Sequence, residues 1–348
     1  KTEYDDKLLI TTIILVVTGI VAVISASLPM CITRHIFPFY YVIQHLFWII
    51  IGGFGLWRLS NFDYKKLRKY AFPFTFGVIV LLLLVKFTPL GVTINGARRW
   101  LNLGFFQFQP SEFSKLALIM LLGNLFSLKK EMFFSKLPKY SFALGIMIFV
   151  VLKQPNLSMT LILLGIAFLM YIMSGKTSKP VVVSLVVFVC LLGMIKINVI
   201  NLYDYLEPHQ IQRLLNSRIS SHIDVEGGGY QVFHSIIAIA SGGMFGCGFG
   251  NSKEKLGWLP EAHTDFIFSV IAEEFGFVGC LFIIMMFLVL FQRGINIAIK
   301  SPTLYGKLLA FGITVCIAMQ AFFNISVATA FLPATGITLP FISYGGSS

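Results

Sequence analysis

Long apolar segments alternate with short polar segments along most of this chain. Several apolar segments reach or approach the roughly 20 residues that a helix needs to cross a bilayer. The pattern predicts an all-α polytopic membrane protein, a single domain over residues 1–348 with no internal repeat and no soluble part. We expect nine spans, at about residues 8–27, 42–59, 71–87, 111–128, 140–152, 157–173, 180–197, 265–291 and 308–329.

The distribution of lysine and arginine among the polar segments indicates the orientation. Basic residues concentrate after the second, fourth, sixth and eighth spans, as in the cluster from Lys65 to Lys69. Because cytoplasmic loops carry an excess of Lys and Arg, the N-terminus is expected in the cytoplasm. The longest polar segment, at about residues 198–263, is then an extracytoplasmic loop before span eight. Nine spans leave the C-terminus outside, so a tenth span is expected after Ser348.

Composition narrows the class of protein further. Hydrophobic residues make up 57% and charged residues 12% of the chain, whereas soluble domains average about 25% charged residues. Basic cytoplasmic loops and contact with anionic membrane lipids explain the net charge of +12, and no aromatic-rich basic domain indicates nucleic acid. The spacing of the five cysteines suits neither zinc nor a disulfide framework. The sequence contains no Walker loop, so bound ATP is not the energy source.

Three segments interrupt the apolar pattern. Residues 91–112 are predicted to form a polar loop. Residues 232–250 are apolar but broken by glycines, which indicates an amphipathic or re-entrant helix at the outer interface. The tail at residues 333–348 contains two prolines and three glycines and is expected to be a loop or a re-entrant segment.

The stretch LPEAHTDFIFSVIAEE, at residues 259–274, joins the long polar segment to an apolar span. Asp265 therefore stands about where water gives way to hydrocarbon, and an ionisable group at that depth marks a candidate functional site. We predict that it acts as a general base, with His263 and Thr264 beside it as substrate contacts. The alternative is structural, because Thr264 or Asp265 would also suit the N-terminal cap of span eight.

Two further pairs of charged residues lie within predicted spans. Glu273 and Glu274 follow Asp265 along the same helix, and at least one is expected to be buried and hydrogen-bonded in a structural role. Glu112 and Lys115 are three residues apart in span four and therefore share a helix face. They are predicted to form an ion pair. The pair either serves only to neutralise the two charges within the membrane or also holds the helix bundle around a polar cavity.

Arg98 and Arg99 follow span three, on the face where the positive-inside rule disfavours basic residues. Their position indicates either an outward-facing anion site or arginines that only belong to a loop or snorkel to the interface.

Several motifs occur in a fixed order: GARRWLNLG and QPSEFSKLAL, then GYQ and IASGG, then GFGNSKEKLGWLPEAHTDFIFSVIAEE, and finally LPATGITLPFISYGGSS. Together they resemble the SEDS family of shape, elongation, division and sporulation proteins, from the first predicted span to the last residue. Ala262 in PEAHTDF and the motif GNSKEK are more similar to the FtsW branch, whereas FQFQPSEF is closer to the RodA branch. The resemblance therefore leans to FtsW.

The resemblance implies a SEDS-type bundle of ten spans, of which this chain contains about nine, in the bacterial cytoplasmic (inner) membrane. It implies peptidoglycan glycosyltransferase activity on lipid II in cell division or elongation. The implied partners are a class B penicillin-binding protein, which is a transpeptidase, and other divisome or elongasome proteins. Asp265 matches the family's essential aspartate. Positions that the family keeps for cavity structure or substrate are matched by Trp100, Glu112, Lys115 and Arg213, whereas residues 216–228 replace its usual FLDP-containing loop.

Lipid II is a disaccharide-pentapeptide on a polyprenyl diphosphate, and an inverting transfer needs a base on the acceptor hydroxyl and cations on the leaving diphosphate. Asp265 is the predicted base, and the predicted diphosphate contacts are Arg98, Arg99, Lys115 and Arg213. A divalent cation, Mg or Mn, can assist, although no motif indicates a metal site, and no other cofactor is expected. Two alternatives need no base: a lipid II flippase with a polar cavity, and a non-catalytic divisome scaffold.

Overall fold

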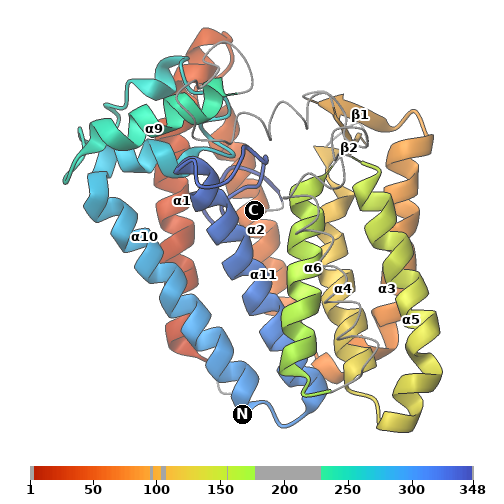
Figure 1. The fold of residues 1–348 in the computed structure, drawn as a ribbon. Helices are drawn as coiled ribbons and strands as arrows, with labels where there is room; N and C mark the ends of the chain where they lie inside the picture. The colour runs from red at the N-terminus through yellow and green to blue at the C-terminus, as the bar shows by residue number, and fades with distance from the viewer. Residues whose placement is uncertain (1–3, 95–96, 103–106, 155, 177–228, 347–348) are drawn as a thin grey trace, which may run out of the picture. The chain divides into compact units, whose positions relative to one another are not determined.

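A computed structural model describes residues 4–94, 97–102, 107–154, 156–176 and 229–346 of the protein (Figure 1). The chain divides into two compact units. Unit 1 comprises residues 1–63, 213–297 and 316–348, and unit 2 comprises residues 64–212 and 298–315. The predicted seventh span and most of the predicted extracytoplasmic loop, at residues 177–228, lie outside the described residues.

Six described helices are long and apolar enough to cross a membrane, and they coincide with predicted spans one, two, three, five, eight and nine. They are α1 (Asp6–Thr33), α2 (Tyr40–Ser60), α3 (Tyr64–Phe87), α5 (Lys130–Leu152), α10 (Ile267–Lys300) and α11 (Leu304–Ala328). Predicted spans four and six correspond to α4 (Pro110–Phe126) and α6 (Leu157–Met173), of 17 residues each. The helical membrane fold is therefore confirmed in both units.

The fifth predicted span, at residues 140–152, is shorter than the helix that contains it. α5 begins at Lys130 and continues through Pro138 to Leu152. The lysines before Tyr140 lower the hydropathy there, so the predicted span begins later than the helix. A helix can extend beyond the apolar part of its sequence.

Unit 2 is built around α4, which lies against α3, α5 and α6. Its side chains are apolar on nearly every face, and Ala117, Leu118, Ile119 and Leu121 are fully buried. A helix that is hydrophobic all round belongs in the centre of a bundle rather than at its edge. This position holds the first turns of α4, with their charged residues, in a fixed place within the unit.

The segment before α4 is a small sheet, so the prediction of a polar loop at residues 91–112 was wrong. The strands β1 (Gly91–Ile94), β2 (Ala97–Asn102) and β3 (Gln107–Phe108) form an antiparallel sheet in that order. The strands contain two to six residues, too few for a clear alternation of polar and apolar positions. In the sequence, the dipeptide Asn95–Gly96 is typical of a two-residue hairpin connection, and it could have predicted the pairing of β1 with β2.

Unit 1 combines α1 and α2 with α9 (Tyr230–Gly242), the short helix η2 (Glu254–Leu256), most of α10 and the second half of α11. Its core contains buried apolar side chains from α1, α10, α11 and the tail, including Leu15, Phe268, Ala321 and Leu339. Residues 333–346 have no helix or strand, which agrees with the prediction of a loop or a re-entrant segment. The helix expected within residues 232–250 is α9, whereas its place at the outer interface stays a prediction.

The long helix α10 is broken at Gly276, where φ is 65° and ψ is −163°. The N–H groups of residues 277–278 donate to the carbonyls of residues 243–244, at 2.9 and 3.2 Å. The carbonyls of residues 273–274 accept from the N–H groups of residues 247–248, at 2.9 and 3.0 Å. In hydrocarbon every backbone polar group needs a partner within the protein, and the loop after α9 supplies those that the break removes.

Candidate active site

Asp265 lies in the turn at residues 261–266, which directly precedes α10, and it is half-buried. Gly336 of the tail packs beside it, because a Cβ added to that glycine would stand 3.3 Å from the Asp265 carboxylate oxygen Oδ2. The φ of Gly336 is also +69°, in the left-handed region that favours glycine. The tail therefore lies against the Asp265 carboxylate.

Thr264 stabilises the turn itself. Its hydroxyl donates to the Glu261 carbonyl at 3.2 Å and to the Glu261 carboxylate at 2.9 Å. Glu261 has a φ of 55°, and its carbonyl also accepts from the N–H groups of Thr264 and Phe266. The Thr264 hydroxyl thus contacts the turn of Glu261, while its predicted contact with substrate stays a prediction.

His263 is buried between two aromatic rings of unit 1. Its ring centroid lies 4.9 Å from that of Tyr41 and 5.4 Å from that of Tyr344. Burial lowers the pKa of His263 from its ordinary value of 6.5, the nearby Glu261 carboxylate raises it, and Arg34 lowers it. Burial, the largest of these effects, therefore favours the neutral form of the imidazole.

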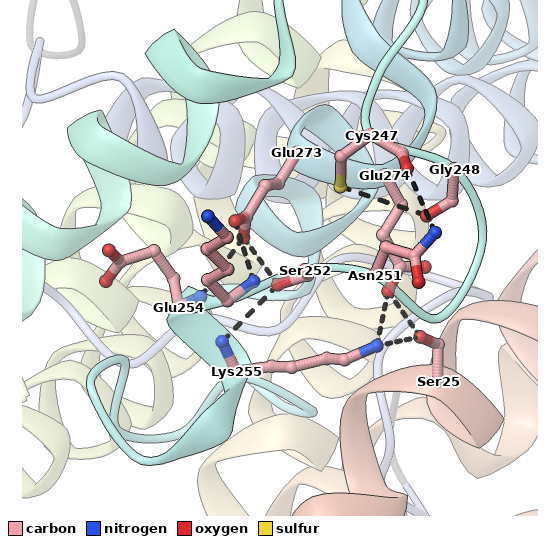
Figure 2. A network of polar contacts seen from close by, with 10 residues as sticks. Ser25, Cys247, Gly248, Asn251, Ser252, Glu254, Lys255, Glu273 and Glu274 are labelled. Atoms are coloured by element: carbon pink, nitrogen blue, oxygen red, sulfur yellow. Dashed lines mark hydrogen bonds and ion pairs between the residues drawn. The ribbon is translucent and has the colours of Figure 1, made fainter.

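Glu273 and Glu274 are both buried, as predicted for at least one of them, and each is surrounded by donors (Figure 2). The Lys255 ammonium lies 2.6 Å from the Glu274 carboxylate and 2.7 Å from the hydroxyl of Ser25 in α1. Ser25 also donates to the same carboxylate oxygen, at 2.5 Å. A buried charge is costly unless it is paired and hydrogen-bonded, and Glu274 meets both conditions.

The Glu273 carboxylate binds the segment that precedes η2. It accepts from the Ser252 hydroxyl and from the backbone N–H groups of Lys253 at 2.8 Å and Glu254 at 3.4 Å. The Glu254 carboxylate in turn lies 2.6 Å from Nδ1 of His234 in α9, whose ring stacks on Trp258. Two adjacent carboxylates of α10 thus bind η2 and α1, in the structural role predicted for them, and Glu254 connects η2 to α9.

Sequence reasoning missed the side-chain partners of these carboxylates, which are Ser25, Lys255 and Ser252. It also missed the neighbouring pair His234–Glu254. The alternating charges of the motif GNSKEK, at residues 250–255, were the usable signal. A lysine so near an apolar span needs an acidic partner, but the sequence does not indicate which carboxylate supplies it.

Unit 2 contains the predicted ion pair. Lys115 Nζ lies 2.6 Å from Glu112 Oε2, and the two side chains are 7% and 15% exposed. The pair lies on one face of α4, as the spacing of three residues predicts. The prediction of this pair is confirmed, while its contribution to a substrate cavity stays a prediction.

The two arginines of the sheet are bound to the ends of neighbouring helices. Arg98 donates to the Thr88 carbonyl directly after α3, and Nε of Arg99 donates to the Gln154 carbonyl after α5 at 3.1 Å. Trp100 is half-buried in β2, opposite Val92 of β1. These contacts give both arginines a structural role, and their predicted contact with diphosphate stays a prediction.

The predicted site residues fall into two groups. Unit 1 contains His263, Thr264 and Asp265 together with Glu273 and Glu274, and unit 2 contains Arg98, Arg99, Trp100, Glu112 and Lys115. Arg213 lies outside the described residues. Among the residues that the structure describes, no group of three or more His, Cys, Asp or Glu side chains could hold a metal ion. A divalent cation therefore stays a prediction.

The fold and the site define an integral membrane protein with a half-buried carboxylate at the start of a span. A family model described as "Cell cycle protein" matches residues 6–348. The chain therefore belongs to the family of the cell cycle proteins FtsW, RodA and SpoVE.

Individual relatives agree with this assignment. A protein of Geobacter sp. (strain M18), named "Probable peptidoglycan glycosyltransferase FtsW", is 37% identical over 99% of this chain and 92% of its own length. Stage V sporulation protein E of Bacillus subtilis (strain 168) is 36% identical, over 100% of this chain and 93% of its own length. The first of these relatives is named as an FtsW protein, which agrees with the resemblance to the FtsW branch.

Solved structures confirm the predicted fold. The crystal structure of the rod shape determining protein RodA of Thermus thermophilus has a TM-score of 0.69 at 26% identity, and covers 99% of this chain and 92% of that one. A structure described as "Structural coordination of polymerization and crosslinking by a peptidoglycan synthase complex" has a TM-score of 0.78 at 26% identity. It covers 100% of this chain and 94% of that one.

Proposed function

We propose that this chain is a peptidoglycan glycosyltransferase that polymerises lipid II into glycan strands. Its membership of the FtsW, RodA and SpoVE family and its relatives named as FtsW glycosyltransferases support this function. The observation that carries the proposal is the half-buried carboxylate of Asp265, held in a turn at the start of α10 beside Gly336. A carboxylate in such a place can accept a proton without being buried too deeply for substrate to reach it.

In the proposed reaction Asp265 removes the proton from the 4-hydroxyl of the acceptor sugar. The freed oxygen attacks the anomeric carbon of the donor sugar, the bond to the diphosphate breaks, and the configuration inverts. The developing negative charge on the diphosphate needs cationic groups, for which the candidates are Arg98, Arg99, Lys115 and Arg213. A bound Mg or Mn ion would supply further positive charge at the diphosphate.

The neutral state of His263 suits this assignment. A protonated imidazole beside Asp265 would stabilise the carboxylate and lower its affinity for the proton. Burial lowers the pKa of His263 instead, which favours the neutral imidazole.

We further propose that the protein lies in the cytoplasmic (inner) membrane of a bacterium, with its N-terminus inside and Asp265 near the outer face. The distribution of basic residues supports this orientation. A class B penicillin-binding protein is the proposed partner, because a structural relative comes from a complex that coordinates polymerisation and crosslinking.

Replacement of Asp265 by asparagine tests the proposed base. Asn keeps the size of the side chain and caps helices about as well as Asp, but it accepts no proton. Glycan synthesis from lipid II by the purified chain with its partner should fall on the order of 10²–10⁴-fold, with thermal stability retained. The matched control Glu261→Gln removes a carboxylate from the same turn and should retain far more activity.

The same variant separates the alternatives. A flippase or a scaffold needs no base. On those alternatives Asp265→Asn would move lipid II across liposomes at the rate of the parent, or would leave unchanged the polymerisation measured with the partner present. The catalytic assignment requires that the Asn variant loses polymerisation. Near-normal polymerisation by this variant would show that Asp265 only caps α10.

A further inference from the structure

The backbone of the Asp265 turn is bound by residues far along the chain. The carbonyl of Asp265 accepts from the side-chain amide of Asn324 in α11, at 2.7 Å. The carbonyl of Thr264 accepts from the hydroxyl of Ser343 at 2.7 Å, and the carbonyl of His263 from the N–H group of Tyr344 at 3.0 Å. Three consecutive carbonyls are therefore each bound by a donor from α11 or the tail.

Asn324 connects the turn to the tail. The same amide nitrogen that donates to Asp265 also donates to the carbonyl of Ile337, at 2.7 Å. The side chain of Asn324 is only 1% exposed, so water cannot readily replace it. Because one amide group binds both carbonyls, it fixes the distance between the turn and the tail segment that contains Gly336.

Ser343 makes a second connection of the same kind. Its hydroxyl accepts from the N–H group of Leu339 at 2.7 Å while it donates to Thr264, and the side chain is fully buried. A hydroxyl that accepts from the tail and donates to the turn has a fixed orientation.

The tail that presents these donors is itself held in place within unit 1. A Cβ added to Gly19 of α1 would meet the carbonyl of Phe341 at 2.6 Å, so the tail packs directly on the backbone of α1. The hydroxyl of Tyr344 donates to the side chain of Gln44 in α2. A support that is itself rigid can position a side chain closely, whereas a mobile loop cannot.

We infer that Asn324 and Ser343 are positioning residues for the Asp265 carboxylate. They bind the carbonyls of the two peptide groups that flank the Asp265 Cα and thereby set the direction in which the Asp265 side chain leaves the backbone. The catalytic part of this inference rests on the proposed function of Asp265, whereas its geometric part does not. Misplacement of a reacting group by about 1 Å can cost about 100-fold in rate, so loss of either contact should slow the reaction.

A spin label tests the geometric part without any assay of activity. Asp265→Cys is made in the full chain after replacement of its five native cysteines, and the thiol is labelled with a nitroxide. Asn324→Ala and Ser343→Ala should each make the label more mobile. Gln320→Ala is the matched control, because the Gln320 side chain donates to the Thr338 carbonyl of the tail from one turn earlier in α11. Equal label mobility in all three variants would overturn the inference.

Kinetics with lipid II test the catalytic part. Asn324→Ala and Ser343→Ala should lower kcat by about tenfold or more while KM changes little, since they misplace the base rather than the binding groups. Added to Asp265→Asn, neither should lower the rate further, because a residue that acts through Asp265 has no effect once the base is gone. Additive losses, or a change confined to KM, would contradict a positioning role.

The two proposals fail in different ways. If Asp265→Asn keeps its activity, the proposed base is wrong, and the spin label still reports whether Asn324 and Ser343 hold the turn. If Asp265→Asn is inactive while the label is equally mobile in every variant, the base stands and the positioning role is wrong. Ser343→Ala removes only one oxygen atom, so it keeps the test available if Asn324→Ala does not fold.

Discussion

Lys255 Nζ lies 2.6 Å from Glu274 Oε1, and the two side chains are only 3% and 1% exposed. The residues are 19 positions apart, one in η2 and the other in α10. The pair belongs to the network of Figure 2 and connects η2 to α10 within unit 1. A buried pair of this kind is a weak source of net stability, but the loss of one partner is severe.

Lys255→Ala should therefore destabilise the protein by roughly 3–5 kcal/mol, because it leaves the Glu274 carboxylate buried without a cation. Replacement of both residues, Lys255→Met with Glu274→Leu, should be less harmful than either single replacement. Thermal unfolding in detergent measures both effects. Equal midpoints for Lys255→Ala and the parent would mean that the pair is not formed.

The break in α10 should depend on the glycine at position 276. A Cβ added there would lie 2.4 Å from the N atom of Gly246 and 2.6 Å from Met244, and its φ of +65° already disfavours alanine. Gly276→Ala should cost about 1–2 kcal/mol for the left-handed backbone and about 1–3 kcal/mol more for the overlap.

Gly250→Ala is the matched control, because Gly250 also has a positive φ but has no atom within 4 Å of the added Cβ. It should cost only the backbone strain. Comparable unfolding midpoints for the two variants would show that the loop does not pack into the break.

The ion pair of α4 should show coupling between its two members. Lys115→Ala leaves the Glu112 carboxylate unpaired at a largely buried site, which costs several kcal/mol in comparable cases. The charge swap Glu112→Lys with Lys115→Glu should restore stability better than either single change. Additive effects in a double-mutant cycle of thermal stability would contradict this prediction.

Stability should depend on pH through His263. Burial lowers the pKa of this histidine in the folded state below its ordinary value of 6.5, so the unfolded chain binds more protons as the pH falls. The contribution of His263 is therefore fully present above about pH 6.5 and decreases as the pH falls toward its folded pKa. Unfolding midpoints between about pH 5 and pH 8 measure it. In His263→Phe this part of the pH dependence should disappear, and its persistence would assign it to other groups.

Cysteine labelling in intact cells tests the orientation. Single cysteines in residues 64–70 and 128–139 should react only with reagents that reach the cytoplasm, because basic segments are retained there. Cysteines in residues 198–261 should react with impermeant reagents from outside. Cytoplasmic labelling of that long segment would place Asp265 on the wrong side for extracytoplasmic synthesis.

The sequence by itself determined the features that depend on neighbouring residues. Apolar length predicted the spans, because a helix that crosses hydrocarbon needs about 20 such residues whatever its surroundings. The spacing of Glu112 and Lys115 predicted their ion pair, because residues three apart in a helix share a face. The position of Asp265 between a polar and an apolar segment indicated the candidate site by the same local reasoning.

Only the tertiary structure decided which distant groups meet. Ser343 binds the carbonyl of Thr264 across 79 positions, and Ser25 binds Glu274 across 249. No periodicity relates such residues, because long-range contacts follow from how helices and loops pack rather than from the local backbone. The sheet at residues 91–108 was missed because its strands are too short for an alternating pattern. The break in α10 at Gly276 was also beyond the sequence, because the loop that supplies its hydrogen bonds lies 28 or more residues earlier in the chain.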